Sequence, residues 1–374
     1  MTDTAAIRAF LDERHFALAR RTFAPLPEPA DDAAARTQAR VLVGRLGTEG
    51  WLQPIADQDW RACCLAREAL AAASPLADAV FALQALGSMP IVLSGNREMK
   101  VRWAEPALAG KKMASFAMTE PEAGSDVAAL STTARRDGDG FVLSGTKTFI
   151  SNAGIADFYT VFATTDRAKG GKGIACFVVP ADAPGVRFVK PLVLSAPHPL
   201  GEIAFEDVRI PASHQLGGDA DGAGYKLGLA TLDRVRTTVG AAACGMAARA
   251  LEEALAHARA RKQFGKTLAE FQLVQEKLAR MATELTAARL LVYRAAWEKD
   301  QGAERVTLEA AMAKAYATEA AQRIVDDAVQ ILGGRGVLAD NPVDRLYRSV
   351  RALRIYEGAT EIQYLIIAGQ LVKP

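Results

Sequence analysis

The chain has 374 residues, of which 50% are hydrophobic and 24% are charged, as in ordinary globular proteins. This length exceeds what one hydrophobic core usually supports, so two or three domains with room for a cofactor are expected. Forty-five basic residues against 43 acidic ones give a net charge of +2, which leaves no basic block for nucleic acid or for a membrane surface.

Targeting and cysteine signals point to the cytoplasm. No run of 18 or more apolar residues occurs, and residues 1–16 carry acids and lack the apolar centre of a signal peptide. The four cysteines have neither a zinc spacing nor the framework of a secreted disulfide protein. We therefore expect a cytoplasmic protein with reduced, structural cysteines and no membrane span.

The first third of the chain is predicted to be helical. Residues 4–23 and the Ala- and Leu-rich residues 36–110 show a helical pattern, separated by the Pro-rich stretch "PLPEPADD" at 25–32. Breaks in the second helical region are expected at Gly87, Pro90 and Gly95.

Residues 112–211 change to the pattern of a β-domain. The runs "GFVLSGTKTFI", "DFYTVFATT", "KGIACFVVP", "GVRFVKPL" and "GEIAFEDVRI" are short and rich in β-formers, and Gly, Pro, Asn or Asp separates them. This pattern predicts a small middle domain made of strands.

Helical periodicity returns beyond residue 224. Two narrow apolar seams run through residues 271–295 and 306–328, and the second ends at Gly333 and Gly334. Seams of this kind predict an antiparallel bundle, with the glycines ending the second helix. The expected domains are 1–112 (N-terminal helical), 113–216 (middle β) and 217–374 (C-terminal helical bundle).

Known metal and nucleotide motifs are missing from the sequence. None of the four histidines follows a Glu by three residues, as di-iron bundles require, and no Walker loop or Gly-x-Gly-x-x-Gly turn occurs. We therefore expect no metal site and no classical nucleotide-binding fold.

Three other stretches are dense in polar groups, and each has a structural alternative. "SFAMTEPEAGSD" (115–126) offers backbone N–H groups and hydroxyls to a ligand, or is a turn. "RKQFGKTLAEFQ" (261–272) suits a phosphate and a flat ring, or is a helix hairpin. "QILGGRGV" (330–337) lets a ligand approach the backbone, or ends a helix.

Together with "GTKTFISNAG", "AFEDVRIP" and "RIYEGATEIQ", these stretches, in this order and spacing, resemble the acyl-CoA dehydrogenase family over nearly the whole chain. The resemblance implies an α+β multidomain fold: a helical N-terminal domain, a β-barrel-like middle domain and a C-terminal four-helix bundle. It also implies FAD as cofactor and a homotetramer, a dimer of dimers, as the assembly.

The carboxylate of Glu357, in "RIYEGATEIQ", matches the catalytic base of the family. From the residues alone, this carboxylate is either a charge at a helix start or a base kept partly dry by Ile355 and Tyr356. Burial would raise its pKa toward neutrality, which suits removal of a weakly acidic α-proton. Some relatives carry the base on another helix, but Val235 stands at that position here and cannot take a proton.

The resemblance also assigns binding residues. Contacts to FAD are implied for Phe116, Met118, Thr119, Gly124, Ser125, Phe149, Ile150, Ser151, Arg261, Phe264, Leu268, Phe271, Gln272, Gln330, Gly333, Gly334, Thr360 and Glu361, partly from a neighbouring subunit. Substrate contacts are implied for Ser125, Asp233, Arg236 and Gly358, although an Asp–Arg pair three residues apart on a helix is also a common ion pair.

The expected reaction is FAD-dependent α,β-dehydrogenation of an acyl-CoA, with electrons passed to an electron-transferring flavoprotein. An oxidase that uses oxygen, or a non-catalytic member that binds flavin or CoA, are the alternatives. The sequence departs from the family pattern at Ala359, which puts one FAD hydrogen bond in doubt, and at the Pro–His–Pro around His198. His198 either tunes substrate choice or is a turn residue.

Overall fold

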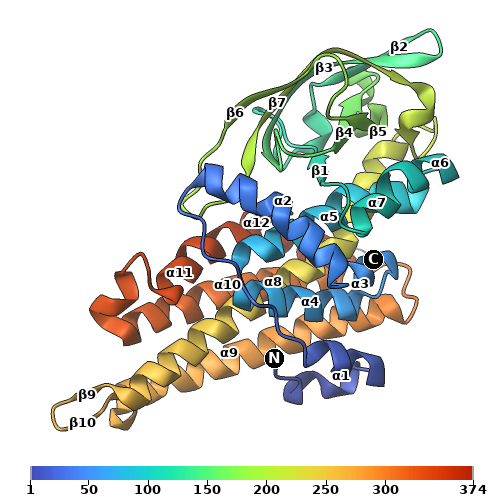
Figure 1. The fold of residues 1–374 in the computed structure, drawn as a ribbon. Helices are drawn as coiled ribbons and strands as arrows, with labels where there is room; N and C mark the ends of the chain where they lie inside the picture. Colours follow the sequence, from blue (N-terminus) through green and yellow to red (C-terminus); the bar gives the residue numbers. More distant parts are fainter. Residues whose placement is uncertain (1, 373–374) are drawn as a thin grey trace. The chain divides into compact units, whose positions relative to one another are not determined.

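The computed structural model describes residues 2–372 of the chain (Figure 1). The chain forms two compact units built from interleaved segments. The bundle unit contains Met1–Leu26, Gln58–Asp78 and Arg236–Pro374, and the sheet unit contains Pro27–Asp57 and Ala79–Val235. The predicted order of a helical region, a β region and a second helical region is confirmed, whereas the three domain boundaries remain a prediction.

Helices form most of the first 110 residues, as predicted. The Pro-rich stretch separates α1 from α2 and contains no helix before Asp32. The helices of this region are α1 (Glu13–Ala19), α2 (Asp32–Thr48), α3 (Gln53–Ala56), α4 (Trp60–Ala73), α5 (Pro75–Ser94), α6 (Arg97–Met99) and α7 (Glu105–Leu108), with short helical turns at Ala5–Phe10 and Lys100–Ala104.

Helix α5 corrects one expectation, because it continues through Gly87 and Pro90 and ends only before Gly95. A Cβ at Gly87 would lie 2.7 Å from the Ala114 Cβ and 2.8 Å from the Ser115 nitrogen. Glycine is therefore used here for close packing and not to break the helix. Helix α5 is long and apolar enough to cross a membrane, but 83% of its apolar window is buried inside the protein, as in the core helix of a globular protein.

The middle region folds into one mixed sheet, whose strand order is β6-β7-β3-β2-β4-β5-β8, with β1 paired to β4. The β1–β4 and β2–β4 pairs are parallel and the other pairs are antiparallel. The five predicted strand runs become β3 to β7. The strands are β1 (Ala114–Ala117), β2 (Thr133–Asp137), β3 (Gly140–Ser151), β4 (Phe158–Thr164), β5 (Ile174–Pro180), β6 (Val186–Pro191), β7 (Leu200–Pro211) and β8 (Gln215–Leu216).

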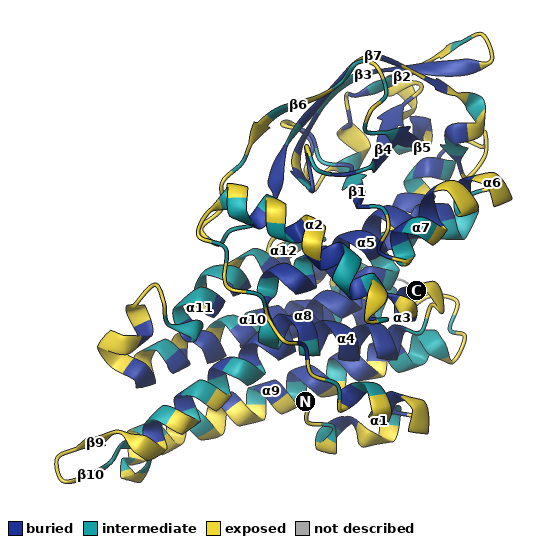
Figure 2. Ribbon diagram, viewed as in Figure 1, coloured by how far each residue is buried: buried dark blue, intermediate teal, exposed yellow. Residues whose placement is uncertain are grey.

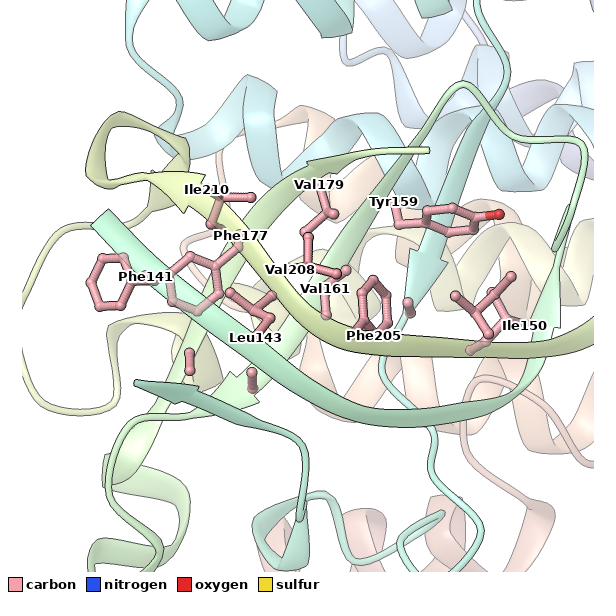
Figure 3. Packing of buried hydrophobic residues seen from close by; sticks show 14 of the residues in the cluster. Phe141, Leu143, Ile150, Tyr159, Val161, Phe177, Val179, Phe205, Val208 and Ile210 are labelled. Atoms are coloured by element: carbon pink, nitrogen blue, oxygen red, sulfur yellow. The ribbon is translucent and has the colours of Figure 1, made fainter. Parts of the chain in front are cut away.

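Strands β4 and β5 are buried on both faces, which explains their nearly continuous apolar sequences. In β4, Tyr159 and Val161 belong to a core with Phe177 and Phe205 (Figure 3). The alternate residue Phe162 belongs to a second core that includes apolar residues of α5 to α7. The sheet therefore has an apolar layer on each face.

A buried ion pair joins the turn after β1 to strand β3. Lys147 Nζ lies 2.7 Å from Glu120 Oε1 and donates to the Met118 carbonyl at 3.0 Å. The same carboxylate accepts from the backbone N–H groups of Ser131 at 2.6 Å and Thr132 at 2.9 Å. Although burial opposes its charge, Lys147 and these donors lower the pKa of Glu120 to about 2, so the pair fixes two segments with predicted FAD residues.

Five helices follow the sheet: α8 (Ala223–Ala260), α9 (Gln272–Asp300), α10 (Thr307–Leu332), α11 (Pro342–Leu353) and α12 (Thr360–Leu371). The seam of α10 is buried throughout (Figure 2), and Gly333 follows the last residue of this helix with φ 59°, as predicted. The α9 seam is buried only from Met281 onward. Its first turns, including Val274 and Leu278, are partly exposed in this single chain.

The four cysteines, Cys63, Cys64, Cys176 and Cys244, are all buried. Burial raises the pKa of the Cys176 and Cys244 thiols well above their ordinary value. These groups therefore stay protonated at neutral pH, in keeping with a structural role.

Replacing Lys147 by Met should lower the free energy of unfolding by about 3 kcal/mol, because it leaves the Glu120 carboxylate buried without its cation. The matched control is Lys169→Met, since Lys169 and Asp221 form an ion pair whose side chains are 46% and 61% exposed, and such pairs contribute little. Urea unfolding measures both. Equal effects of the two substitutions would contradict the importance of the buried pair.

Candidate active site in the bundle unit and candidate flavin surface in the sheet unit

Glu357 lies in the short connection between α11 and α12 and has a left-handed backbone conformation, with φ 54°. Gly358 follows with φ 94°. This φ favours glycine, and a Cβ at Gly358 would in addition lie 2.4 Å from Gln363 Nε2. Glycine adopts such a conformation without strain, but Glu357 does not, and strained residues of this kind concentrate at functional sites.

The carbonyl groups of this turn accept from three side chains. Lys314 Nζ donates to the Gly358 oxygen at 2.7 Å, and Gln363 Nε2 donates to the same oxygen at 2.9 Å. Arg236 Nε donates to the Glu357 oxygen at 3.3 Å. The turn is therefore fixed from α8, α10 and α12, which compensates for its backbone strain.

The carboxyl group of Glu357 is desolvated, and its Oε2 atom is buried without a hydrogen-bond partner in the described structure. Burial raises the pKa of this carboxyl above its ordinary value, against the opposing charges of Arg67, Lys314 and Arg236. The rise in pKa caused by burial is larger than the fall caused by the three cations. A carboxylate in this environment is a stronger base than one in water.

Arg67 is held away from direct pairing with Glu357 by its own partners. Its guanidinium donates to both oxygens of Asp78, at 2.8 and 2.9 Å, and to Thr238 Oγ1 at 3.0 Å. Arg67 and Asp78 are both buried. Asp78 thus neutralises this cation, which limits how far Arg67 can stabilise the Glu357 anion.

Lys314 was missed by the sequence reasoning, as were Arg67 and Gln363. Lys314 is fully buried on α10, and this burial lowers its pKa to about 8, with Glu357 opposing the shift. Its signal in the sequence is a lysine within an Ala-rich apolar seam, and Arg67 likewise interrupts the apolar run of α4. Because burying a cation is costly, a cation in an apolar run indicates a special role for either residue.

The start of α12 contains two predicted FAD contacts. Thr360 Oγ1 donates to Glu319 Oε1 at 2.7 Å, and the same carboxylate oxygen accepts from Arg354 Nε at 2.7 Å. Thr360 is buried, whereas Glu361 is exposed. In this chain the Thr360 hydroxyl therefore has a protein partner, and its contact with FAD stays a prediction.

The remaining predicted FAD residues of the bundle unit gather at one end of the bundle (Figure 1). Lys277 of α9 lies 2.7 Å from Asp327 of α10, which brings the start of α9 beside the end of α10. The hairpin of β9 (Lys262–Gln263) and β10 (Lys266–Thr267) lies there, and Phe264 at its tip is 93% exposed. The residues at this end are Arg261, Phe264, Leu268, Phe271, Gln272, Gln330, Gly333 and Gly334.

This end of the bundle is remote from the Glu357 turn. Lys314, which contacts that turn, is sixteen residues before Gln330 on the same helix, a separation of about 24 Å at about 1.5 Å per residue. Within one chain, the structure therefore does not bring Gln330 and its neighbours at the bundle end close to Glu357.

A second group of predicted residues surrounds the end of β3 in the sheet unit. The pairing of β3 with β7 shifts register between Lys147 and Ile150, and Phe149 within this bulge has φ 54° and is 62% exposed. Ile150 points into the core of the sheet (Figure 3). A bulge re-aims side chains and is common beside active sites, and here it leaves the Phe149 ring exposed.

The other predicted residues of the sheet unit lie on β1 and the turn after it. Phe116 is partly buried and its ring packs against Phe162 at 4.9 Å between centroids. Met118 is buried, whereas Gly124 and Ser125 are exposed, and no heavy atom lies within 4 Å of a Cβ placed at Gly124. Thr119 is partly buried and its carbonyl accepts from the Thr148 N–H at 3.0 Å.

Asp233 and Arg236 both lie on α8, where Asp233 is partly exposed and Arg236 is buried. Their predicted contacts with CoA remain untested. Within residues 2–372 no group of three or more His, Cys, Asp or Glu side chains could hold a metal ion.

Replacing Gly358 by Ala should destabilise the turn by about 1–3 kcal/mol, since a Cβ at φ 94° is strained and meets Gln363. Gly369→Ala is the matched control, because Gly369 lies within α12 and has no atom near its Cβ position, so alanine should be neutral or stabilising there. Thermal unfolding compares the two variants. Equal stability of both would show that Gly358 is not required for the turn.

Comparison with known proteins identifies the family. Residues 115–208 match the acyl-CoA dehydrogenase middle domain, and residues 222–372 match the acyl-CoA dehydrogenase C-terminal domain. The chain is 45% identical over 286 residues to the 3-(aryl)acrylate reductase of Clostridium sporogenes, an alignment that covers 76% of this chain and 75% of that protein.

It is also 45% identical over 287 residues to the mitochondrial short-chain specific acyl-CoA dehydrogenase of Bos taurus, covering 76% of this chain and 69% of that protein. The solved butyryl-CoA dehydrogenase from Megasphaera elsdenii superposes with a TM-score of 0.86 at 33% identity over 100% of both chains. The chain therefore belongs to the acyl-CoA dehydrogenase family of flavoprotein oxidoreductases, which act on CH–CH bonds.

Proposed function

We propose that this protein dehydrogenates the α,β bond of an acyl-CoA thioester, with Glu357 as the base. The observation that carries the proposal is the Oε2 atom of Glu357, which is buried and has no hydrogen-bond partner in the described structure. A structural carboxylate in a protein interior is normally paired or hydrogen-bonded. An orphan oxygen held in a strained turn is better explained as a group whose partner is the substrate.

The environment of Glu357 suits removal of a proton from carbon. A proton α to a thioester is weakly acidic, so the base must be positioned and basic, and the enolate must be stabilised by preorganised donors. Burial raises the pKa of Glu357, and Lys314 and Arg236 hold its turn in place. The backbone N–H of Glu357 is proposed as one donor to the enolate oxygen.

FAD fits the residues that are present. When bound, it supplies the acceptor for the hydrogen and electron pair that leave the β-carbon. Phe149 offers an exposed aromatic ring, and Ser151, two residues further along β3, offers a hydroxyl. The open turn at Gly124 and Ser125 leaves room for an approaching phosphate. Arg261 offers a charge-assisted hydrogen bond to a pyrophosphate.

A homotetramer, a dimer of dimers, is proposed as the active assembly. Gln330 lies about 24 Å along α10 from Lys314, which contacts the Glu357 turn. We therefore propose that Arg261 and Gln330 contact the FAD of a neighbouring subunit and not the FAD beside their own Glu357. Each flavin would then be completed by a neighbouring subunit.

Substrate and partner are proposed from the relatives. The names of the Bos taurus and Megasphaera elsdenii proteins indicate short acyl chains, so short acyl-CoAs are the proposed substrates. Ser125, Asp233, Arg236 and Gly358 are the proposed substrate contacts, and an electron-transferring flavoprotein is the proposed acceptor in the cytoplasm. An oxygen-using oxidase and a non-catalytic flavin-binding member are the competing functions.

Glu357→Gln should lower kcat with a short acyl-CoA by about 10²- to 10⁴-fold, the usual contribution of a general base, while FAD stays bound. Glu13→Gln is the matched control, since Glu13 is exposed on α1.

Because burial raises the pKa of Glu357, the protonated form is favoured by folding, and this stability is lost as pH rises through the raised pKa. The Gln variant should therefore be at least as stable as the wild type at neutral pH.

The unfolding temperature measures the effect of Glu357→Gln on stability, and anaerobic single-turnover reduction of the flavin measures its effect on the chemical step. A Glu357→Gln protein that reduces its flavin at the wild-type rate would refute the assignment of the base. In the wild type, the rate of the same step should fall as pH is lowered through the pKa of Glu357, because only the carboxylate can accept the α-proton.

The acceptor distinguishes a dehydrogenase from an oxidase. With saturating acyl-CoA, turnover in air without another acceptor should produce hydrogen peroxide far more slowly than turnover with an electron-transferring flavoprotein. A coupled peroxidase assay measures the first rate and dye reduction through the flavoprotein the second. Peroxide formation as fast as dye reduction would favour the oxidase.

A further inference from the structure

Glu319 of α10 contacts both ends of the turn that carries Glu357, and the proposed mechanism gives it no role. Its Oε1 atom accepts from Arg354 Nε at 2.7 Å and from Thr360 Oγ1 at 2.7 Å. Arg354 precedes Glu357 by three residues, and Thr360 follows it by three. One carboxylate oxygen therefore holds the entry and the exit of the turn together.

The backbone closes the turn at the same two residues. The Thr360 N–H donates to the Arg354 carbonyl at 3.1 Å, where α11 has just ended and α12 begins. Between them lies Glu357 with φ 54°, a conformation that residues other than glycine keep only when the surrounding structure enforces it. Opening the ends of the turn would release Glu357 from this conformation.

The start of α12 has no capping side chain of its own. Its N-cap residue is Ala359, which forms no side-chain hydrogen bond to the first turn, and alanine is a poor N-cap. The Thr360 hydroxyl, one residue later, donates to Glu319 instead. A carboxylate beside a helix N-terminus is also favoured by the helix dipole. Glu319 therefore supplies, from another helix, the support that Ala359 does not give.

Glu319 is ionised at neutral pH. Burial opposes the charge of its carboxyl, but the hydrogen bonds from Arg354 and Thr360 and the charges of Arg354 and Arg323 lower its pKa below the ordinary value. Hydrogen bonds to an ionised acceptor are about twice as strong as neutral ones. Both ends of the turn are thus bonded to an anion.

Helix α10 holds the turn at two points with opposite charges. Lys314 Nζ donates to the Gly358 carbonyl in the middle of the turn at 2.7 Å, whereas Glu319 accepts at its ends. The two side chains are five residues apart on a helix whose apolar seam is buried. The turn is therefore fixed to a rigid element, as the precise placement of a functional group requires.

We propose that Glu319 is a positioning residue for Glu357, because its bonds to Arg354 and Thr360 close the turn that keeps Glu357 in its left-handed conformation. This inference rests on the proposed function, in which Glu357 is the base. Glu319 itself exchanges no proton with the substrate. Its effect reaches the reaction through the backbone of the turn.

The test compares anaerobic flavin reduction in variants that break the two bonds, with the acyl-CoA that reduces the wild-type flavin fastest and butyryl-CoA tried first. Glu319→Ala should be slower by about 10- to 100-fold, because misplacing a catalytic group by about 1 Å can cost about 10²-fold. Glu319→Gln, which keeps an acceptor oxygen without the charge, should lose less. Glu309→Gln is the matched control, since Glu309 lies ten residues earlier on the same helix.

Thr360 provides a second pair of variants, which test the inference even if Glu319→Ala does not fold. Thr360→Val keeps the shape of the side chain and removes the hydroxyl, so it should slow flavin reduction. Thr360→Ser keeps the hydroxyl and should recover most of the loss. The double variant Glu319→Ala, Thr360→Val should be no slower than Glu319→Ala alone, because the two side chains act through one bond.

The pH dependence of flavin reduction is a readout that a merely structural role would not move. Thr360→Val changes no charge and leaves in place the charged groups that act on Glu357, namely Arg67, Lys314, Arg236 and Asp78. When the turn opens and water reaches the carboxyl, the raised pKa of Glu357 falls toward its ordinary value. The midpoint of the rate–pH profile should therefore shift to lower pH.

Hydrogen exchange gives a readout that needs no substrate. The N–H groups of Thr360 and Gln363 donate to the carbonyls of Arg354 and Ala359. They should exchange faster in Glu319→Ala and in Thr360→Val, while amides in the middle of α10 keep the wild-type rate.

The outcomes separate this inference from the proposed function. Wild-type reduction rates and pH midpoints in Glu319→Ala and Thr360→Val, with a slow Glu357→Gln in the same assay, would overturn the inference alone. Weaker FAD binding by Thr360→Val, with a wild-type rate at saturating FAD, would also overturn it, since Thr360 would then act on the cofactor. A wild-type flavin that no acyl-CoA reduces would overturn both.

Discussion

The desolvated carboxyl group of Glu357 is the constraint on which the rest of the bundle unit depends. Its turn needs two left-handed residues and has its carbonyl groups fixed by Lys314, Gln363 and Arg236. Each of these side chains is buried, and burying cations is costly. Burying these side chains costs the unit stability, and the turn they hold carries a carboxyl group that forms no direct salt bridge among the described residues.

Direct pairing with a cation would be incompatible with the role proposed for Glu357. A guanidinium bonded to Glu357 would lower the pKa of the carboxyl and occupy the lone pairs that must take a proton. Arg67 could do this, but Asp78 holds its guanidinium through two hydrogen bonds. Lys314 and Arg236 instead bond the backbone of the turn, while the carboxyl oxygen Oε2 has no hydrogen-bond partner in the described structure.

The sheet unit uses buried charge differently. Glu120 and Lys147 are fully paired, and the carboxylate has further backbone donors, so this pair serves to join two segments. Within the same region, Phe149 is exposed at a bulge. Lys147 and Phe149 are two residues apart on β3, so the paired charge helps to fix the strand that carries the exposed ring, and a fixed surface loses less entropy when it binds the proposed cofactor.

Much of this organisation was predictable from the sequence. The strand runs of β3 to β7, the seam of α10 and the stop at Gly333 depend on local periodicity, which a single sequence contains. Helix α5 continues through Gly87 and Pro90, contrary to the prediction. At Gly87 tertiary packing decides the role, because this residue lies against β1.

The roles of Lys314 and Arg67 at the site could not be predicted, because their partners are distant in sequence. The exposure of the first turns of α9 could not be predicted from its apolar seam. A hydrogen bond between Ser151 and His198 joins positions 47 residues apart, and the two bonds of Glu319 span 35 and 41 residues, beyond any local pattern.

The most direct measurement is the visible spectrum of the purified protein, followed anaerobically while straight, branched, cyclic and aryl acyl-CoAs are added in turn. The account predicts a yellow protein whose flavin absorption is bleached by one class of thioester, short acyl-CoAs first among them. A yellow protein that no thioester bleaches, or a colourless protein that cannot be reconstituted with FAD, would contradict it.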